Sequence, residues 1–281
     1  MPNILKSCLR YQGSKYEMIK QHRIHEFIPP TNVNQPYCEL FCGSAIMFFN
    51  IQTTCAYIND SNADLTNFWI QVLTNKEQLE QVLKYVWNGQ QFIEFFKHAE
   101  PTPLNRAVAF FLNNTLGTTY LTYPSFVTKN FDVWKEKMDS ARLTIFTEDY
   151  QKVLEIVDQL RNPHSKRAIN ENRDLHAVFY ADPPYFGSEE IYQQGTFDHI
   201  QFAKNIHKYA DIGHHIIISY NKCPEILDLY KDWYIEEFNL KRLTQYATDR
   251  TELLISNQKL RRYSQKYAKE TDLITLFQHK K

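Results

Sequence analysis

The sequence predicts an α/β fold whose sheet is interrupted by an inserted, mostly helical domain. Residues 37–41 are predicted to form a compact strand, which a small-residue turn and a helix-like apolar run follow. Residues 177–181 form another apolar, β-prone run that is typical of a buried strand. Between them, from about residue 68 to residue 142, helical patterns replace the strands. Strands and helices on both sides of a helical stretch indicate one α/β domain with an insertion.

The composition of the 281-residue chain is that of a globular protein. Hydrophobic residues make up 43% of it, which supports a sizeable core. Lys plus Arg and Asp plus Glu number 32 each, so any nucleic-acid binding must come from a local patch. No apolar run approaches the length of a membrane-spanning helix. The sequence also lacks the positively charged start followed by an apolar stretch that is typical of an export signal. We therefore expect a cytoplasmic protein that is neither exported nor inserted into a membrane.

The cysteines and histidines predict neither disulfides nor a metal site. Five cysteines are an odd number and none is arranged as Cys-x-x-Cys, which favours buried, reduced thiols. Ten histidines include two close pairs, but none has the His-Glu-x-x-His spacing of a zinc site. We expect a function without a metal.

The first element is a loop at residues 9–15, which precedes a helical stretch. Gly13 and Lys15 are typical of a loop that meets a ligand, although a solvated surface charge is the alternative for Lys15. The chain has only seven glycines, so we expect each to stand where a side chain would obstruct something. Gly13, Gly43 and Gly187 all fall in loops next to the predicted site.

The strand at residues 37–41 and the turn after it predict a ligand cradle. Gly43 would let the backbone approach a ligand closely. The helix that begins near residue 46 would offer unpaired amides to a carboxylate. The pattern is not the Gly-x-Gly-x-x-Gly of dinucleotide-binding proteins.

A second strand at residues 55–58 ends beside Asp60. Doubly wound folds bind a ribose diol with an acid at the end of their second strand. The alternative is that Asp60 or Ser61 caps the helix that begins near Asn62.

The domain boundaries follow from the change of pattern. We predict residues 1–70 and 142–281 as the two parts of the α/β domain and residues 71–141 as the insertion. The α/β pattern resumes with a strand at residues 142–146, whose exit at Asp149 and Tyr150 leads into a helix. Further predicted elements are a helix at 151–160, a linker at 161–174, a flexible lid at 187–196, a strand at 214–220 and a hairpin of segments 242–246 and 252–256.

The tetrad, residues 182–185, has the sequence Asp-Pro-Pro-Tyr and follows the strand at 177–181. The prolines restrict their own backbone and force Asp182 into an extended conformation, so a carboxylate, two carbonyls and an aromatic ring project together. Asp182 could accept hydrogen bonds from an amine while Tyr185 stacks on a flat ring. Adenine or cytosine in nucleic acid fits this description. The alternative is an ordinary Pro-Pro turn.

Two other stretches have residues that suit nucleic acid. Residues 113–130 carry amides and hydroxyls that could read base edges, and lysines that could meet phosphates, although the stretch could equally be a plain loop. The candidates there are Asn114, Thr118, Tyr120 and Lys129. From residue 256 onward, seven basic side chains stand against two acidic ones, a net charge of +5. Arg261 and Arg262 could contact phosphates, or the tail could be a solvated end.

Five motifs in order resemble the Dam-type family of S-adenosylmethionine-dependent DNA adenine methyltransferases. They lie at residues 11–15, 39–45, 59–64, 149–150 and 182–185. The resemblance spans nearly the whole chain and implies a Rossmann-like methyltransferase sheet with an inserted, mostly helical target-recognition domain. It implies cofactor contacts by Tyr11, Lys15, Glu39, Phe41, Gly43, Asp60, Asp149, Tyr150 and Asp182. It also implies that Asp182, Pro183 and Tyr185 hold the target base, and residues 250–257 resemble the family's last strand pair.

The function that the resemblance implies is methyl transfer to the exocyclic amine of an adenine flipped out of double-stranded DNA. It further implies a possible cognate restriction endonuclease and a bacterial or phage-infected host cell. Alternatives are a catalytically silent DNA-binding relative, or a methyltransferase that acts on RNA, cytosine or a protein glutamine. Residues 117–123 lack the Gly-rich hairpin with Arg and Asn of the members that read GATC, so that specificity does not carry over.

Overall fold

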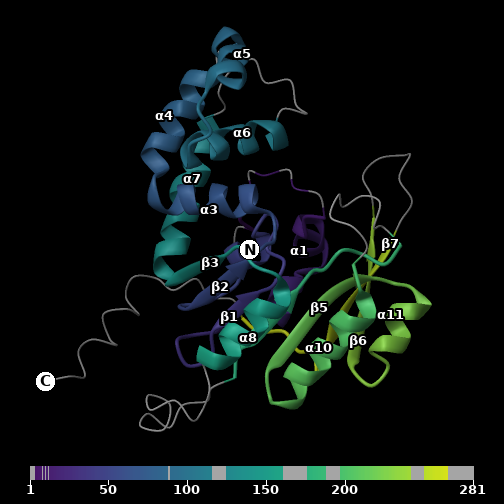
Figure 1. Cartoon of the computed structure of the whole chain (residues 1–281). Helices are drawn as coiled ribbons and strands as arrows, with labels where there is room; N and C mark the ends of the chain where they lie inside the picture. The colour runs from purple at the N-terminus through teal and green to yellow at the C-terminus, as the bar shows by residue number, and fades with distance from the viewer. Residues whose placement is uncertain are drawn as a thin grey trace, which may run out of the picture.

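The computed structural model describes residues 4–7, 9, 11, 13–87, 89–115, 125–160, 176–187, 197–241 and 250–264. These residues form one sheet of seven strands in the order β3-β2-β1-β4-β5-β7-β6 (Figure 1). The strands are β1 (Tyr37–Glu39), β2 (Ala56–Asn59), β3 (Leu143–Phe146), β4 (Val178–Ala181), β5 (His215–Asn221), β6 (Tyr234–Leu240) and β7 (Arg250–Ser256). Strands β1 to β5 are parallel, so the expected α/β fold is confirmed.

The last two strands form an antiparallel hairpin in which β7 lies between β5 and β6. The first strand of this hairpin is Tyr234–Leu240, which the sequence analysis did not predict, whereas the predicted segment at residues 242–246 lies outside the described residues. Alternation of apolar and polar residues predicts that a segment is a strand, but it does not predict which strand it pairs with. Two neighbouring β-prone segments can show the same alternation.

Helices cover both faces of the sheet, so the residues of its central strand β4 are buried on both faces. All four residues of Val178–Ala181 are buried. Val178 and Tyr180 pack into one core cluster, whereas Phe179 and Ala181 pack into the other, as the two-residue period of a strand requires. One face carries α1 (Tyr16–His22), the short 3₁₀ helix η1 (Ile24–Phe27) and α2 (Ile46–Asn50), and the other carries α8 (Tyr150–Leu160), α10 (His199–Asp211) and α11 (Pro224–Leu229).

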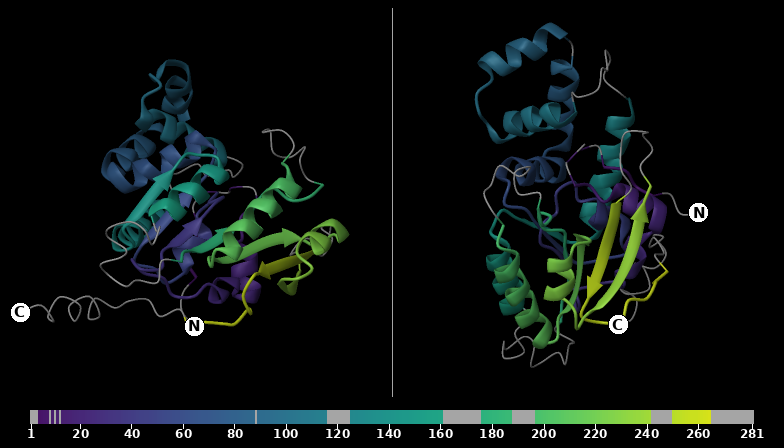
Figure 2. Two further views of the ribbon diagram at one scale, coloured as in Figure 1. Left: turned by 60° about the horizontal axis from the view of Figure 1, so that its bottom comes forward. Right: turned by 90° about the vertical axis from the view of Figure 1, so that its right-hand side faces the viewer.

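Five consecutive helices separate β2 from β3 and stack on one end of the sheet (Figure 2). They are α3 (Ala63–Thr74), α4 (Lys76–Val86), α5 (Gly89–His98), α6 (Pro103–Thr115) and α7 (Ser125–Ser140). Fully buried aromatic rings join three of them, α3, α6 and α7: these are Phe68, Trp69, Phe111, Phe131 and Trp134. The predicted boundary after residue 70 falls inside α3, and both ends of the polar stretch 113–130 are helical, so the plain-loop alternative does not hold for residues 113–115 and 125–130.

The order of the strands locates the site before any side chain is considered. From β1 the chain continues to β2 on one side, whereas β4, the other neighbour of β1, leads to β5 on the opposite side. Open α/β sheets bind ligands where the strand order reverses, outside the carboxyl ends of the strands. The turn with Gly43 follows β1, and the tetrad follows β4. We call this side of the sheet, where β1 to β5 end, the carboxyl edge.

Candidate active site

A cavity of about 1190 Å³ lies at the carboxyl edge. This exceeds the volume of a typical pocket for a drug-sized ligand, so the cavity has room for a cofactor and part of a second molecule. Pro184 lines it, while Pro183, which the sequence places in the site, is buried beside it. The cavity brings together eleven of the residues predicted from the sequence: Tyr11, Lys15, Glu39, Phe41, Gly43, Asp60, Asn114, Asp149, Tyr150, Asp182 and Tyr185.

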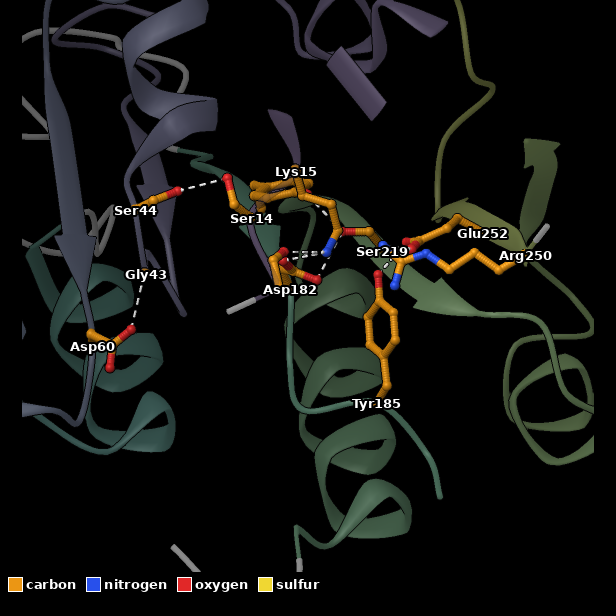
Figure 3. Close-up of polar contacts among 12 residues, drawn as sticks. Ser14, Lys15, Gly43, Ser44, Asp60, Asp182, Tyr185, Ser219, Arg250 and Glu252 are labelled. Carbon is orange, nitrogen blue, oxygen red and sulfur yellow. Dashed lines mark hydrogen bonds and ion pairs between the residues drawn. The ribbon is translucent and has the colours of Figure 1, made fainter. Parts of the chain in front are cut away.

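Asp182 is held by two donors at the end of β4. Lys15 Nζ donates to its Oδ2 at 2.5 Å, and Ser219 Oγ on β5 donates to its Oδ1 at 3.3 Å (Figure 3). Burial raises the pKa of Asp182 to about 6, although the ammonium group of Lys15 opposes the rise. The acid is therefore ionised at neutral pH but lies close to its titration range.

Lys15 is a buried residue, with only 3% of its surface exposed, so the alternative of a solvated surface charge is wrong. Its ammonium group also donates to the carbonyl of Gly13 at 3.1 Å and lies 4.8 Å from the centre of the Tyr185 ring. Ser44 Oγ, in the turn after β1, donates to Ser14 Oγ at 3.1 Å. The loop of residues 13–15 is therefore tied both to the tetrad and to the cradle.

The tetrad is anchored by two strands that follow it in the chain. The Tyr185 hydroxyl donates to Glu252 on β7, and Asn221 Nδ2 at the end of β5 donates to the Phe186 carbonyl at 3.1 Å. Burial raises the pKa of Tyr185 well above its ordinary value, so the phenol remains protonated. Sequence reasoning missed Glu252, although an acid inside the apolar run of residues 250–256 is a signal that could have identified it.

Gly43 adopts a left-handed backbone conformation, with φ of +46°, and a Cβ atom there would lie 3.2 Å from the Tyr11 ring. Asp60 accepts from the amides of Gly43 and Asn62, both at 3.0 Å, and burial raises its pKa. The predicted alternative that Asp60 or Ser61 caps the next helix is wrong, because the Asn62 side chain accepts from the first-turn amides of α3. Asp60 instead joins the turn after β1 to the end of β2.

Glu39 is buried at the end of β1, where its carboxylate accepts from the Tyr37 hydroxyl at 2.9 Å and the Phe48 amide at 3.1 Å. Burial raises the pKa of Glu39 to about 8, against the effect of these two hydrogen bonds. The Phe48 amide lies in the first turn of α2, so one of the amides expected to be unpaired there is already used by the protein. Glu39 therefore both supports α2 and lines the cavity.

Aromatic rings form one wall of the cavity. The Phe41 ring lies 5.6 Å from that of Tyr150 and 5.8 Å from that of Phe197, measured between ring centres. The Asp149 carboxylate beside them accepts from the Gln151 amide at 2.8 Å at the start of α8. These rings suit a flat, aromatic ligand group.

The described lining of the cavity is strongly acidic. Lys15 is its only basic residue, against six acidic residues: Glu39, Asp60, Glu148, Asp149, Asp182 and Asp198. A cleft with one sign of charge attracts ligands of the opposite sign. This lining favours a cationic ligand and disfavours one that carries phosphates.

The predicted DNA contacts are only partly visible in the structure. Asn114, near the end of α6, lines the cavity together with Phe110, whose carbonyl accepts from Asn114 Nδ2 at 2.9 Å. Thr118, Tyr120 and the side chain of Lys129 lie outside the described residues.

Arg261 and Arg262 lie away from the carboxyl edge. Ser256, the last residue of β7, pairs with Ile217 near the amino end of β5, so the chain leaves the sheet at the opposite edge. Arg262 then donates to Glu26 at 3.0 Å and stacks over the Phe27 ring at 4.5 Å. Arg262 is thus engaged within the protein, away from the cavity, and phosphate contacts by Arg261 and Arg262 stay a prediction.

The described parts of the chain contain no group of three His, Cys, Asp or Glu side chains placed to hold a metal ion. In the same residues, the thiols of Cys38 and Cys42 are buried, and those of Cys55 and Cys223 are half-buried. None of the helices that the structure describes is both long and apolar enough to cross a bilayer.

The comparison with protein families agrees with this geometry. Residues 11–248 match the model of the D12 class N6 adenine-specific DNA methyltransferases. The match begins in the loop before α1 and extends past the end of β6. It therefore includes both the Gly43 turn and the tetrad. It confirms the resemblance to Dam-type enzymes and removes RNA, cytosine and protein glutamine as alternatives. The chain belongs to this family and is an adenine-specific DNA methyltransferase.

Proposed function

We propose that this enzyme transfers a methyl group from S-adenosylmethionine to the exocyclic amine of an adenine that is flipped out of duplex DNA. The observation that carries this proposal is the position of Asp182. Its carboxylate and the Tyr185 ring line the same cavity as the Gly43 turn and Asp60. An acceptor site for an amine and a site for a methyl donor thus share one enclosure.

The residues present fit this cofactor. S-adenosylmethionine supplies a methyl group on a positively charged sulfur atom, and its ammonium group adds a second positive charge. The acidic lining suits these charges, and the wall of Phe41 and Tyr150 suits the cofactor's adenine. Asp60 would accept from the ribose hydroxyls, and the bare backbone at Gly43 leaves room beside the Tyr11 ring. An NAD-type ligand would bring phosphates into the same negative field.

Asp182 and the Pro183 carbonyl would prepare the amine for attack. The lone pair of adenine's exocyclic nitrogen is delocalised into the ring, so the amine is a poor nucleophile. Acceptors for both of its hydrogens draw the lone pair out of conjugation. As the nitrogen gains positive charge, the Asp182 carboxylate stabilises that charge before the proton leaves.

Tyr185 would stabilise the flipped base. Enzymes that act on a base must remove it from the stack, which costs a few kcal/mol. Stacking on an aromatic side chain offsets roughly 1–3 kcal/mol of this cost. The Tyr185 ring, next to Asp182, suits this role.

We further propose residues 71–141 as the target-recognition domain. Helix α6 reaches the cavity at Phe110 and Asn114, so a flipped base would lie beside it. The Arg106 side chain on α6 donates to the Asp64 carboxylate on α3 at 2.6 Å, which ties the insertion to the helix after Asp60. Asn114 would contact bases next to the target, because its amide can both donate and accept.

A randomised pool of DNA tests the function directly. Purified protein, S-adenosylmethionine and either duplex or single-stranded pools are incubated, and the modified bases are sequenced. We expect N6-methyladenine within one short motif, and only in the duplex pool. Methylation of single strands alone would refute the duplex substrate, and modification that requires no added S-adenosylmethionine would refute the donor.

Two finer proposals follow from a site-specific activity on DNA. The enzyme would act in the cytoplasm, where a prokaryotic cell keeps its DNA, and it could protect that DNA from a restriction endonuclease of the same specificity. DNA from cells that express the protein should then resist cleavage by a nuclease that reads the motif found in the pool. Cleavage equal to that of unmodified DNA would refute the protective role.

Asp60→Ala should weaken cofactor binding by about 1.5–3 kcal/mol, roughly tenfold to 150-fold, because a charged hydrogen bond to the ribose is lost. Calorimetry with S-adenosylmethionine measures the effect. Asp64→Ala is a matched control, since Asp64 is exposed and pairs with Arg106 outside the cavity. If the Asp60→Ala variant and the wild type bind the cofactor equally well, Asp60 does not contact the ribose. Its role is then limited to holding the Gly43 and Asn62 amides.

Methyl transfer should fall as the pH decreases through about 6, the raised pKa of Asp182. Below this pH the carboxyl group is protonated and no longer stabilises positive charge on the amine, so kcat should drop about tenfold for each further pH unit. The measurement is kcat at saturating DNA and cofactor between pH 5 and 8, with cofactor affinity determined at each pH because Glu39 titrates near 8. A flat profile down to pH 5 would contradict a charged Asp182 in the reaction.

A further inference from the structure

Glu252 carries a buried carboxylate that contacts the tetrad, and it lies outside the residues that the family model matches. Glu252 is on β7 with none of its surface exposed, and the match ends at residue 248. Its cross-strand partner is Asn221, the last residue of β5. Directly paired residues of an antiparallel ladder point to the same face. Glu252 contacts Tyr185 (Figure 3), and Asn221 contacts the next residue, so both reach the segment that follows the tetrad's aspartate.

The contacts of Glu252 connect it to the site through one side chain. Its Oε2 accepts from the Tyr185 hydroxyl, and its Oε1 lies 2.8 Å from Arg250 Nη2. Tyr185 lines the cavity, whereas Glu252 is absent from the described lining. Among the described contacts, the hydrogen bond that links Glu252 to the lining of the cavity is therefore the one to Tyr185.

We infer that Glu252, braced by Arg250, is a positioning residue that fixes the Tyr185 ring as the stacking surface for the target adenine. This inference rests on the stacking role proposed above for Tyr185. The backbone on either side of the ring is already restrained by Pro184 and by the bond from Asn221 to the Phe186 carbonyl. Neither restraint sets the direction in which the side chain points. A hydrogen bond at its far end does, because it fixes the position of the hydroxyl and therefore the direction of the ring's long axis.

Charge balance supports a fixed arrangement of these groups. Two ion pairs adjoin Tyr185: Lys15 with Asp182, and Arg250 with the Glu252 carboxylate that accepts from the Tyr185 hydroxyl. A buried carboxylate that accepts from a hydroxyl makes a stronger hydrogen bond than a neutral acceptor does. The negative charge of Glu252 also adds to the rise in the pKa of Asp182, so the two acids lie close enough to interact. An apolar residue at position 252 would leave Arg250 and the phenol without this partner.

The test is a double-mutant cycle of Glu252→Gln and Tyr185→Phe. Each single variant should lower kcat by about 10- to 100-fold, because a displaced ring misplaces the base, while the affinity for S-adenosylmethionine stays within about twofold. The double variant should be no slower than Tyr185→Phe, since removal of the hydroxyl already disconnects Glu252. Glu237→Gln on the adjacent strand is the matched control, because Glu237 is exposed and pairs only with Lys222 among the described contacts.

The outcomes distinguish the stacking role of Tyr185 from the positioning role of Glu252. Tyr185→Ala with wild-type activity refutes the stacking role, whereas an inactive Tyr185→Ala beside a fully active Glu252→Gln refutes only the positioning role. Additive losses in the double variant also overturn it, because Glu252 then acts by another route. If thermal melting shows that Glu252→Gln unfolds, Arg250→Gln takes its place in the cycle. Arg250→Gln should cause a smaller loss in kcat, and it should cause no further loss when it is added to Tyr185→Phe.

Discussion

Asp182→Asn should lower kcat by roughly 10²- to 10³-fold, and Asp182→Ala by at least as much, while both variants fold and bind S-adenosylmethionine. The amide keeps the shape of the side chain but removes the negative charge that stabilises the developing cation on adenine's amine. That charge matters only during the reaction, so the loss should appear in kcat rather than in the affinity for DNA.

The contact between Lys15 and Asp182 makes Asp182→Asn a more informative variant than Asp182→Ala. The Lys15 ammonium group is buried and bonds to Asp182, so Asp182→Ala leaves a buried cation with less compensation than Asp182→Asn does. Single-turnover kinetics, with calorimetry for both ligands, separates chemistry from binding. Asp228→Asn, at an exposed residue of α11, is the control for the loss of a carboxylate. Wild-type turnover by folded Asp182→Asn would refute the proposed mechanism.

Trp69→Ala should lower the free energy of unfolding by about 3–5 kcal/mol. The Trp69 ring on α3 is fully buried between Phe68, Phe49 and Trp134, at centre distances of 4.9, 5.4 and 5.8 Å. Its removal leaves a cavity where the helical insertion meets the sheet. Urea unfolding followed by circular dichroism gives the change in stability.

The same residue connects the core to the cradle. Trp69 Nε1 donates to the Gly43 carbonyl at 3.0 Å, so Trp69→Phe should keep most of the packing but free the turn after β1. We expect Trp69→Phe to lose about 1–3 kcal/mol of stability and to bind S-adenosylmethionine more weakly. Tyr85→Ala on α4, where the ring is 65% exposed, should change neither quantity. Unaltered cofactor affinity in Trp69→Phe would show that the turn keeps its shape without this bond.

Local patterns in the sequence determine the strands and the motifs of this protein. Residues 177–181 predict β4 because burial on both faces requires apolar residues, and residues 37–41 predict β1 although Glu39 interrupts the apolar run. The tetrad is recognisable because its prolines and its aspartate act within four consecutive residues. Since parallel strands end at one edge, the motifs at Gly43, Asp60 and Asp182 were expected to meet there, and they line one cavity.

Partners that are distant in the chain were decided by the tertiary structure alone. Lys15 and Asp182 are separated by 167 residues, and nothing local distinguishes this lysine from a surface charge. Glu252 reaches Tyr185 only because β7 inserts between β5 and β6, an order that alternation cannot specify. Arg262 reaches Glu26 because the chain leaves β7 at the edge opposite the cavity, a path that no local pattern in the tail specifies. Sequence periodicity sets which face of an element is buried, whereas strand order and chain path decide which charges meet.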